Sequence, residues 1–169
     1  VNILCMKHVE CYITRVYPVV PRRWLIVSSE QTISLEFHLE SANFEKAGEA
    51  SSKIKRVLQQ IGVRPEIIRR ISISSYEAEM NVIIHAQQGQ VKAFIYSDRT
   101  EIFIEDQGPG IPDIDKALQE GFSTAPDHIR EMGFGAGMGL PNIAKCTDVF
   151  NIQSEPGIGT KIHITIRHW

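Results

Sequence analysis

Long apolar runs are missing from this sequence. No stretch approaches the ~20 residues that a membrane-spanning helix needs, and the first residues lack the charged start, apolar centre and cleavage site of a signal peptide. We therefore expect no membrane segment and a cytoplasmic location. An excess of positive charge is also missing, because the formal net charge is −2. Nucleic acid is for that reason not an expected partner.

Cysteine is scarce as well. The three cysteines are an odd number without the spacing of a disulfide framework, which favours a reducing compartment. Cys5, His8 and Cys11 are spaced by threes, as metal ligands can be, but a fourth ligand is missing. Free buried thiols are the favoured interpretation of these cysteines.

Glycine is plentiful, yet the common phosphate-binding motifs are absent. No GxxxxGK[ST] occurs, which excludes a P-loop. The glycines of "GFGAGMGL" at 133–140 are spaced by twos and follow no strand. This spacing fits neither a dinucleotide-binding fold nor the glycine loop of the eukaryotic-type protein kinases.

The periodicity of the apolar residues predicts five strands. Alternation indicates a strand at 32–39, and two further strands at 91–98 and 100–108 joined as a hairpin around Asp98 and Arg99. The turn "PGIG" separates the two closing strands, which we expect at 149–155 and 159–166.

Helical spacing predicts the remaining elements. Ser41 is expected to cap a helix that runs through Leu58 and stops at Gly62, and Pro65 is expected to open a second helix that runs through Ile84. Residues 117–146 combine a short helix, a loop that we expect to be mobile, and another helix.

These elements predict one α+β domain. The 43% apolar content of the 169 residues suffices for a single core. We expect a two-layer sandwich with helices on one face of a mixed, mostly antiparallel sheet, formed by residues 32–169. Residues 1–31 contain "PVVPRRW", whose prolines discourage regular elements, and are predicted to be an N-terminal extension.

The segment "EAEMNVIIH" at 77–85 carries unusually many polar groups for an apolar helix. Glu77 and Asn81 are four residues apart and therefore share one face, whereas Glu79 faces elsewhere. In isolation this pattern would indicate a solvated acid and a helix-capping amide. His85 is expected to be a packed or hydrogen-bonded histidine rather than a catalyst.

Four motifs in a fixed order change that interpretation: "EAEMN" at 77–81, "DQGPGI" at 106–111, "GFGAGMGL" at 133–140 and "GTKI" at 159–162. They resemble the N, G1, G2 and Gly-Thr boxes of the ATP-binding superfamily of gyrase, the ninety-kilodalton heat-shock chaperone, histidine kinases and MutL (GHKL). The likeness covers about residues 32–168. "EAEMNVIIHA" and "GMGLPN" narrow it to the anti-sigma-factor serine/threonine kinases and, given the long glycine run, the related switch kinases.

The resemblance implies ATP and Mg²⁺ as ligands. Glu77 is then the general base, and Asn81 supplies an oxygen to Mg²⁺. Asp106, with the help of Thr160, accepts a hydrogen bond from the adenine amino group. Residues 122–137 correspond to the ATP lid, in which Arg130, apart from His128, is the basic side chain able to reach phosphate. The further expected nucleotide contacts are Gly108, Gly110, Ile111, Gly135, Gly137, Met138, Gly139 and Leu140.

The function implied by the resemblance is an ATP-dependent protein serine/threonine kinase in a bacterial sigma-factor pathway. Its substrate would be a small anti-anti-sigma-type antagonist protein. Binding of a sigma factor itself and homodimerisation stay open. The alternative is a nucleotide-gated protein-binding module with little phosphotransfer. A histidine kinase and the gyrase-like or MutL-like machines are disfavoured, because neither a helical phosphoacceptor domain nor a transducer domain is evident in the sequence.

Overall fold

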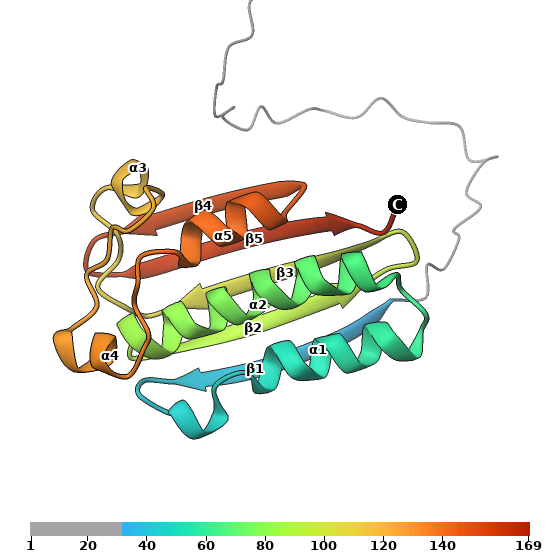
Figure 1. Ribbon diagram of the computed structural model, residues 1–169, viewed down its shortest axis with the longest axis horizontal. Coiled ribbons are helices and arrows are strands. Elements are labelled where there is room, and N and C mark those ends of the chain that lie inside the picture. Colours follow the sequence, from blue (N-terminus) through green and yellow to red (C-terminus); the bar gives the residue numbers. More distant parts are fainter. Residues whose placement is uncertain (1–31) are drawn as a thin grey trace, which may run out of the picture.

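The computed structural model describes residues 32–169, which form a five-stranded sheet with helices on one face (Figure 1). The extension expected at 1–31, including Cys5, His8 and Cys11, lies outside the described residues. The elements in chain order are β1 (Ile33–Glu40), the 3₁₀ turn η1 (Phe44–Lys46), α1 (Glu49–Gln60), α2 (Pro65–His85), β2 (Gln88–Ile95), β3 (Arg99–Asp106), α3 (Ile114–Ala117), α4 (Asp127–Glu131), α5 (Gly139–Cys146), β4 (Val149–Glu155) and β5 (Gly159–Arg167).

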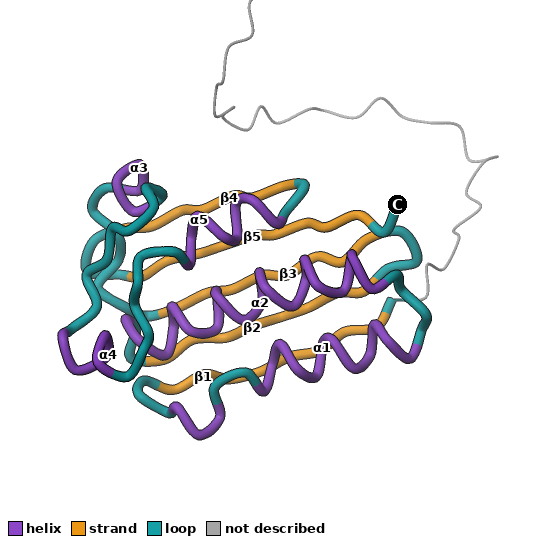
Figure 2. The backbone as a smooth tube through the Cα atoms, in the orientation of Figure 1, coloured by secondary structure: helices purple, strands orange, loops and turns teal. Residues whose placement is uncertain are grey.

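The strand order across the sheet is β1-β2-β3-β5-β4. All four pairings between the described strands are antiparallel, so the expectation of a mixed sheet is wrong in that respect. The connection between β1 and β2 explains the difference. Two helices, α1 and α2, run back and forth between these strands, so β2 starts at the end of the sheet where β1 finishes (Figure 2). A parallel neighbour would need a single crossover.

The core lies between the sheet and three helices, with α2 packed between α1 and α5 (Figures 1 and 2). Alternate residues of β2 and β3 point into it, and the opposite face of these strands carries the more exposed side chains. No helix among the described residues is long and apolar enough to cross a membrane. The fully or nearly fully buried apolar residues at the centre are Ile54, Leu58, Ile71, Ala78, Val91, Ala93, Ile95, Ile102, Ile143, Ile164 and Ile166.

The helix predicted to start at Ser41 is interrupted in the structure. The chain first makes the 3₁₀ turn η1 and then turns at Gly48, whose φ of 87° is left-handed, before α1 begins. Ser41 does not cap this helix, and its N–H donates to the Gln87 carbonyl at 3.0 Å. The end at Gly62 and the start of α2 at Pro65 are as predicted.

Candidate functional site

Glu77 and Asn81 face the first residue of α5. A Cβ atom on Gly139 would lie 3.0 Å from Asn81 Oδ1 and 3.5 Å from Glu77 Oε2, so a larger residue would crowd both side chains. Asn142, one turn further along α5, donates a hydrogen bond of 2.8 Å from Nδ2 to Glu77 Oε1. The structure thus brings Glu77, Asn81 and Gly139 together, and it adds Asn142, which the sequence analysis did not single out.

Glu79 points away from this cluster. Its side chain is fully buried, and its two carboxylate oxygens accept the backbone N–H groups of Ala50 and Ser51, each at 3.2 Å. Glu77, two residues earlier, is only partly buried. The two acids of "EAE" therefore contact different elements. Glu79 bonds to the start of α1, and Glu77 faces α5.

Asp106 lies at the end of β3, beside the start of β5. Its Oδ1 accepts the backbone N–H of Thr160 at 3.2 Å. Burial raises the pKa of Asp106, and the N–H groups of Thr160 and Gly108 partly oppose that rise by stabilising the carboxylate. The carboxyl is half-buried and keeps acceptor capacity beyond these bonds, which suits it to a ligand that donates a hydrogen bond.

Ser154 connects the segment after Asp106 to the start of β5. Its Oγ accepts the Ile111 N–H at 2.7 Å, lies 2.9 Å from Thr160 Oγ1 and donates to the Gly159 carbonyl at 3.0 Å. Sequence reasoning missed this residue, although its place directly before the "EPGIGT" turn was a signal. Its bonds hold the "DQGPGI" and "GTKI" motifs against each other.

Two glycines allow the close approach between those motifs. Gly110 has a φ of 69°, and a Cβ there would lie 2.2 Å from the Glu155 carbonyl oxygen. A Cβ on Gly159 would lie 2.0 Å from the carbonyl oxygen of Asp106. Neither position accepts a side chain without displacing backbone. Gly110 therefore lets the segment after β3 approach the end of β4, and Gly159 lets the start of β5 approach Asp106.

The expected lid, residues 122–137, contains α4. Its ends meet, because the Gly121 N–H donates to the Gly137 carbonyl at 3.0 Å. Within it, Phe134 stacks on Phe44 of η1 with ring centroids 5.6 Å apart. This stack joins the lid to the β1–α1 connection.

Arg130 makes its polar contacts inside the lid. Its guanidinium donates to the Ser123 carbonyl at 3.1 Å and lies 3.9 Å from Asp127 Oδ1. Its assignment as a phosphate-binding side chain stays a prediction. Of the other expected contacts, Met138 directly precedes α5 and Leu140 packs against the core.

His85 is also where the sequence analysis expected it, packed near the end of α2. Burial lowers its pKa, which favours the neutral imidazole. No hydrogen bond or charge partner brings it to Glu77 among the contacts of the described residues, and it is not part of the candidate site.

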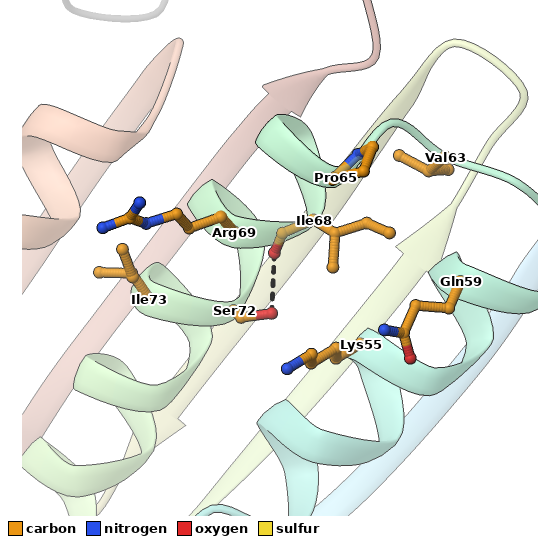
Figure 3. Close-up of a pocket in the computed structure, with 8 residues that line it drawn as sticks. All are labelled: Lys55, Gln59, Val63, Pro65, Ile68, Arg69, Ser72 and Ile73. Carbon is orange, nitrogen blue, oxygen red and sulfur yellow. Dashed lines mark hydrogen bonds between the residues drawn. The ribbon is translucent and has the colours of Figure 1, made fainter.

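A separate groove lies between α1 and α2, and none of its lining residues belongs to the cluster around Glu77. Figure 3 shows the side chains that line it. Its volume is about 630 Å³. Ser72, on its wall, donates its hydroxyl to the Ile68 carbonyl at 2.7 Å. No residue expected to bind nucleotide contributes to this groove, whose lining consists of Lys55, Gln59, Val63, Pro65, Ile68, Arg69, Ser72 and Ile73.

Glu77 and Asn81 on α2, the Asp106 carboxyl at the end of β3 and the lid that precedes α5 belong to one α+β sandwich. Residues 67–169 match the family described as histidine kinase-, DNA gyrase B- and HSP90-like ATPases, and the chain belongs to this family. The matched range contains all four motifs and excludes β1 and α1.

Within this family, the chain is similar to a smaller group of curated proteins. It is similar to the serine/threonine-protein kinase RsbT of Bacillus subtilis (strain 168), with 35% identity over 112 residues that cover 64% of this chain and 78% of RsbT. It is also similar to the anti-sigma F factor of Caldanaerobacter subterraneus subsp. tengcongensis, with 34% identity over 105 residues that cover 59% and 70% of the two chains. The anti-sigma F factor of Clostridium beijerinckii is 29% identical over 142 residues, which cover 80% of this chain and 94% of that protein.

Proposed function

We propose that this chain is an ATP-dependent protein serine/threonine kinase of a bacterial sigma-factor pathway, acting on a small antagonist protein. The observation that carries the proposal is the pairing of Glu77 and Asn81 against Gly139 at the start of α5. A carboxylate and an amide oxygen converge there on a position where Gly139 contributes no side chain. The names of the relatives support it, since one is a serine/threonine-protein kinase and others are anti-sigma factors.

The reaction is transfer of the γ-phosphoryl group of ATP to a hydroxyl of the protein substrate. The hydroxyl oxygen forms a bond to the γ-phosphorus, the bond from that phosphorus to the β,γ-bridging oxygen breaks, and ADP leaves. The hydroxyl proton passes to the Glu77 carboxylate, which acts as the general base. Asp106 accepts a hydrogen bond from the adenine amino group. Thr160 lies beside Asp106, because its N–H donates to Asp106 Oδ1.

A magnesium ion fits the donor set of this site. Mg²⁺ prefers oxygen ligands and commonly combines one or two protein ligands with substrate phosphates. Asn81 Oδ1 would be such a ligand and would add no negative charge beside a triphosphate. The described residues contain no group of three or more His, Cys, Asp or Glu side chains able to hold a metal by themselves. Asn81 would therefore share the ion with the phosphates, whose charge the ion offsets.

The glycines around α5 supply the phosphate contacts in this proposal. Backbone N–H groups at Gly135, Gly137 and Gly139, together with the positive end of α5, favour an anion. Gly108, Gly110 and Ile111 contact the adenine base. Arg130 binds the phosphates after its hydrogen bond to the Ser123 carbonyl breaks.

The finer parts of the proposal concern partners and place. The substrate is an anti-anti-sigma-type protein, a sigma factor is a further candidate partner, and the kinase acts in the cytoplasm, either alone or as a homodimer. The relatives' names, a serine/threonine-protein kinase and anti-sigma F factors, support the sigma-factor pathway alone.

Labelling with γ-³²P-ATP and Mg²⁺ in an extract of the source cells tests the proposal. The wild-type chain is compared with Glu77→Ala and with Glu66→Ala, which removes an exposed glutamate from the first turn of the same helix. We expect one labelled small protein, a loss of about 10²–10⁴-fold in labelling rate for Glu77→Ala, and wild-type labelling for Glu66→Ala. All three chains should bind ATP. Full labelling by Glu77→Ala would remove the base from the mechanism.

A second candidate function is a nucleotide-gated binding module with little phosphotransfer. The stacking of Phe134 in the lid on Phe44 favours this function. A nucleotide that contacts the lid would, through this stack, also change the surface beside β1 and α1. This function predicts no labelled protein, capture of a partner that differs between ATP and ADP, and no effect of Glu77→Ala on capture.

A further inference from the structure

Asn142 contacts the side chain that the proposed mechanism uses as its base. We propose that Asn142 is a positioning residue for Glu77, whose amide holds one carboxylate oxygen so that the other receives the substrate proton. The inference rests on the proposed kinase function and adds to it a residue from α5, 65 positions further along the chain.

The chemistry of the contact fixes its direction. An ionised carboxylate only accepts hydrogen bonds, so the 2.8 Å contact at Glu77 Oε1 must come from the Asn142 amide nitrogen. Oε1 is then engaged. Oε2 remains as an acceptor, and it is the oxygen that faces Gly139. The donor is uncharged, so it orients the carboxylate without supplying a proton that would neutralise the base.

The backbone on both sides of the contact is well fixed. The Asn142 N–H donates to the Met138 carbonyl at 2.9 Å, and its neighbours Pro141 and Ile143 are buried. On the other side, Ala78 follows Glu77 on α2 and is completely buried in the core. A side chain that bridges two fixed backbones holds its partner in one geometry, which is what proton transfer in a transition state requires.

The opposing interpretation is that Asn142 only fastens α5 to α2. The two roles differ in what a substitution changes. A fastening residue would alter ATP affinity and thermal stability together with activity, because α5 begins at the glycines expected to bind phosphate. A positioning residue alters the rate of phosphoryl transfer and leaves ATP affinity unchanged.

The experiment compares Asn142→Ala with Asn142→Gln and with Asn151→Ala. Alanine at position 142 removes the amide and favours the helical conformation, so α5 should remain formed. Glutamine restores an amide on a longer side chain. Asn151 is exposed in β4 and provides the same chemical change away from α2. Each variant is assayed for transfer from γ-³²P-ATP to the purified protein that the labelling experiment identifies, and for ATP affinity by calorimetry.

We expect Asn142→Ala to lower kcat by about 10-fold, with the KM and Kd for ATP within twofold of wild type. Asn142→Gln should recover part of the rate, and Asn151→Ala should match wild type. In a Glu77→Gln background, Asn142→Ala should cause no further loss, since the two residues act as one unit.

Two results would overturn the inference. An unchanged kcat for Asn142→Ala would show that Glu77 needs no such support, and equal losses in kcat and ATP affinity would make Asn142 a fastening residue. Either result leaves the kinase proposal standing, because the wild-type chain still transfers phosphate. If the wild-type chain transfers none, the kinase proposal fails and the positioning role fails with it.

Discussion

The buried carboxylate of Glu79 accepts a hydrogen bond of 3.2 Å from the backbone N–H of Ser51, and so caps a helix from another element. Gly48 precedes α1 and has no side chain that could satisfy the first N–H groups of that helix. Glu79 supplies both oxygens from α2 instead, and its negative charge lies at the positive end of α1. Glu79 therefore fixes the start of α1 against α2, in addition to the apolar packing of Ile54 and Leu58 in the core.

Replacing Glu79 by alanine should lower the free energy of unfolding by about 3 kcal/mol, because two buried N–H groups lose a charged acceptor. Urea denaturation of the ligand-free chain measures it. The control is Glu49→Ala, which removes an exposed acid from the first turn of the same helix and should cost below about 1 kcal/mol. Equal losses for the two variants would show that the Glu79 cap contributes nothing specific.

The carboxyl of Asp106 should show opposite effects on stability and on binding. Because burial raises its pKa, the stability that this group contributes is present in acid and is lost as the pH rises through the raised pKa. Asp106→Asn keeps an oxygen for the Thr160 N–H and removes the buried charge. Its melting temperature should exceed that of wild type at neutral pH, and the gap should close on acidification.

ATP binding should change in the other direction. The adenine amino group loses a charged acceptor in Asp106→Asn, so the Kd measured by calorimetry at pH 7.5 should rise by about 10-fold. On acidification, the ATP affinity of wild type should fall further than that of Asp106→Asn. Protonation of the ATP phosphates affects both chains equally, so the difference reports the Asp106 carboxyl. An Asp106→Asn chain that binds ATP as wild type does would argue against adenine recognition by this residue.

Gly110 and Gly157 offer a matched pair of substitutions. Both have left-handed φ values, of 69° and 83°, but a Cβ on Gly110 would meet the Glu155 carbonyl oxygen at 2.2 Å and one on Gly157 would meet nothing within 4 Å. Gly157→Ala should cost about 1 kcal/mol of stability from the backbone alone, and Gly110→Ala about 3 kcal/mol because backbone must also move. Thermal unfolding compares them, and similar costs would mean that the close approach is easily relieved.

The family and most of the elements could be predicted from the sequence because they depend on local patterns. Pro65 and the apolar spacing that follows it fixed α2, and a four-residue spacing put Glu77 and Asn81 on one face. The ATPase family expected from the four motifs is confirmed by the match over residues 67–169. The roles assigned to the individual site residues remain predictions.

The features that were missed depend on contacts between distant residues. The start of α1 was wrong because its cap, Glu79, lies 29 positions away from Ala50 and leaves no local signal at Ser41. Asn142 meets Glu77 across 65 positions, and Ser154 meets Ile111 across 43. Such pairings become visible when the strands and helices are placed in space, since periodicity describes one element at a time.

The two ends of the sheet should tolerate insertions very differently. At one end, Gly159 contacts the backbone of Asp106, and the Gly157 N–H donates to the Pro109 carbonyl at 2.8 Å, so the turn between β4 and β5 has no freedom in length. The β2–β3 hairpin turn at 96–98 lies at the opposite end of β3 from Asp106. An affinity tag or fluorescent reporter could therefore be accommodated at the hairpin, whereas one extra residue before Gly159 would pull Thr160 away from its carboxyl.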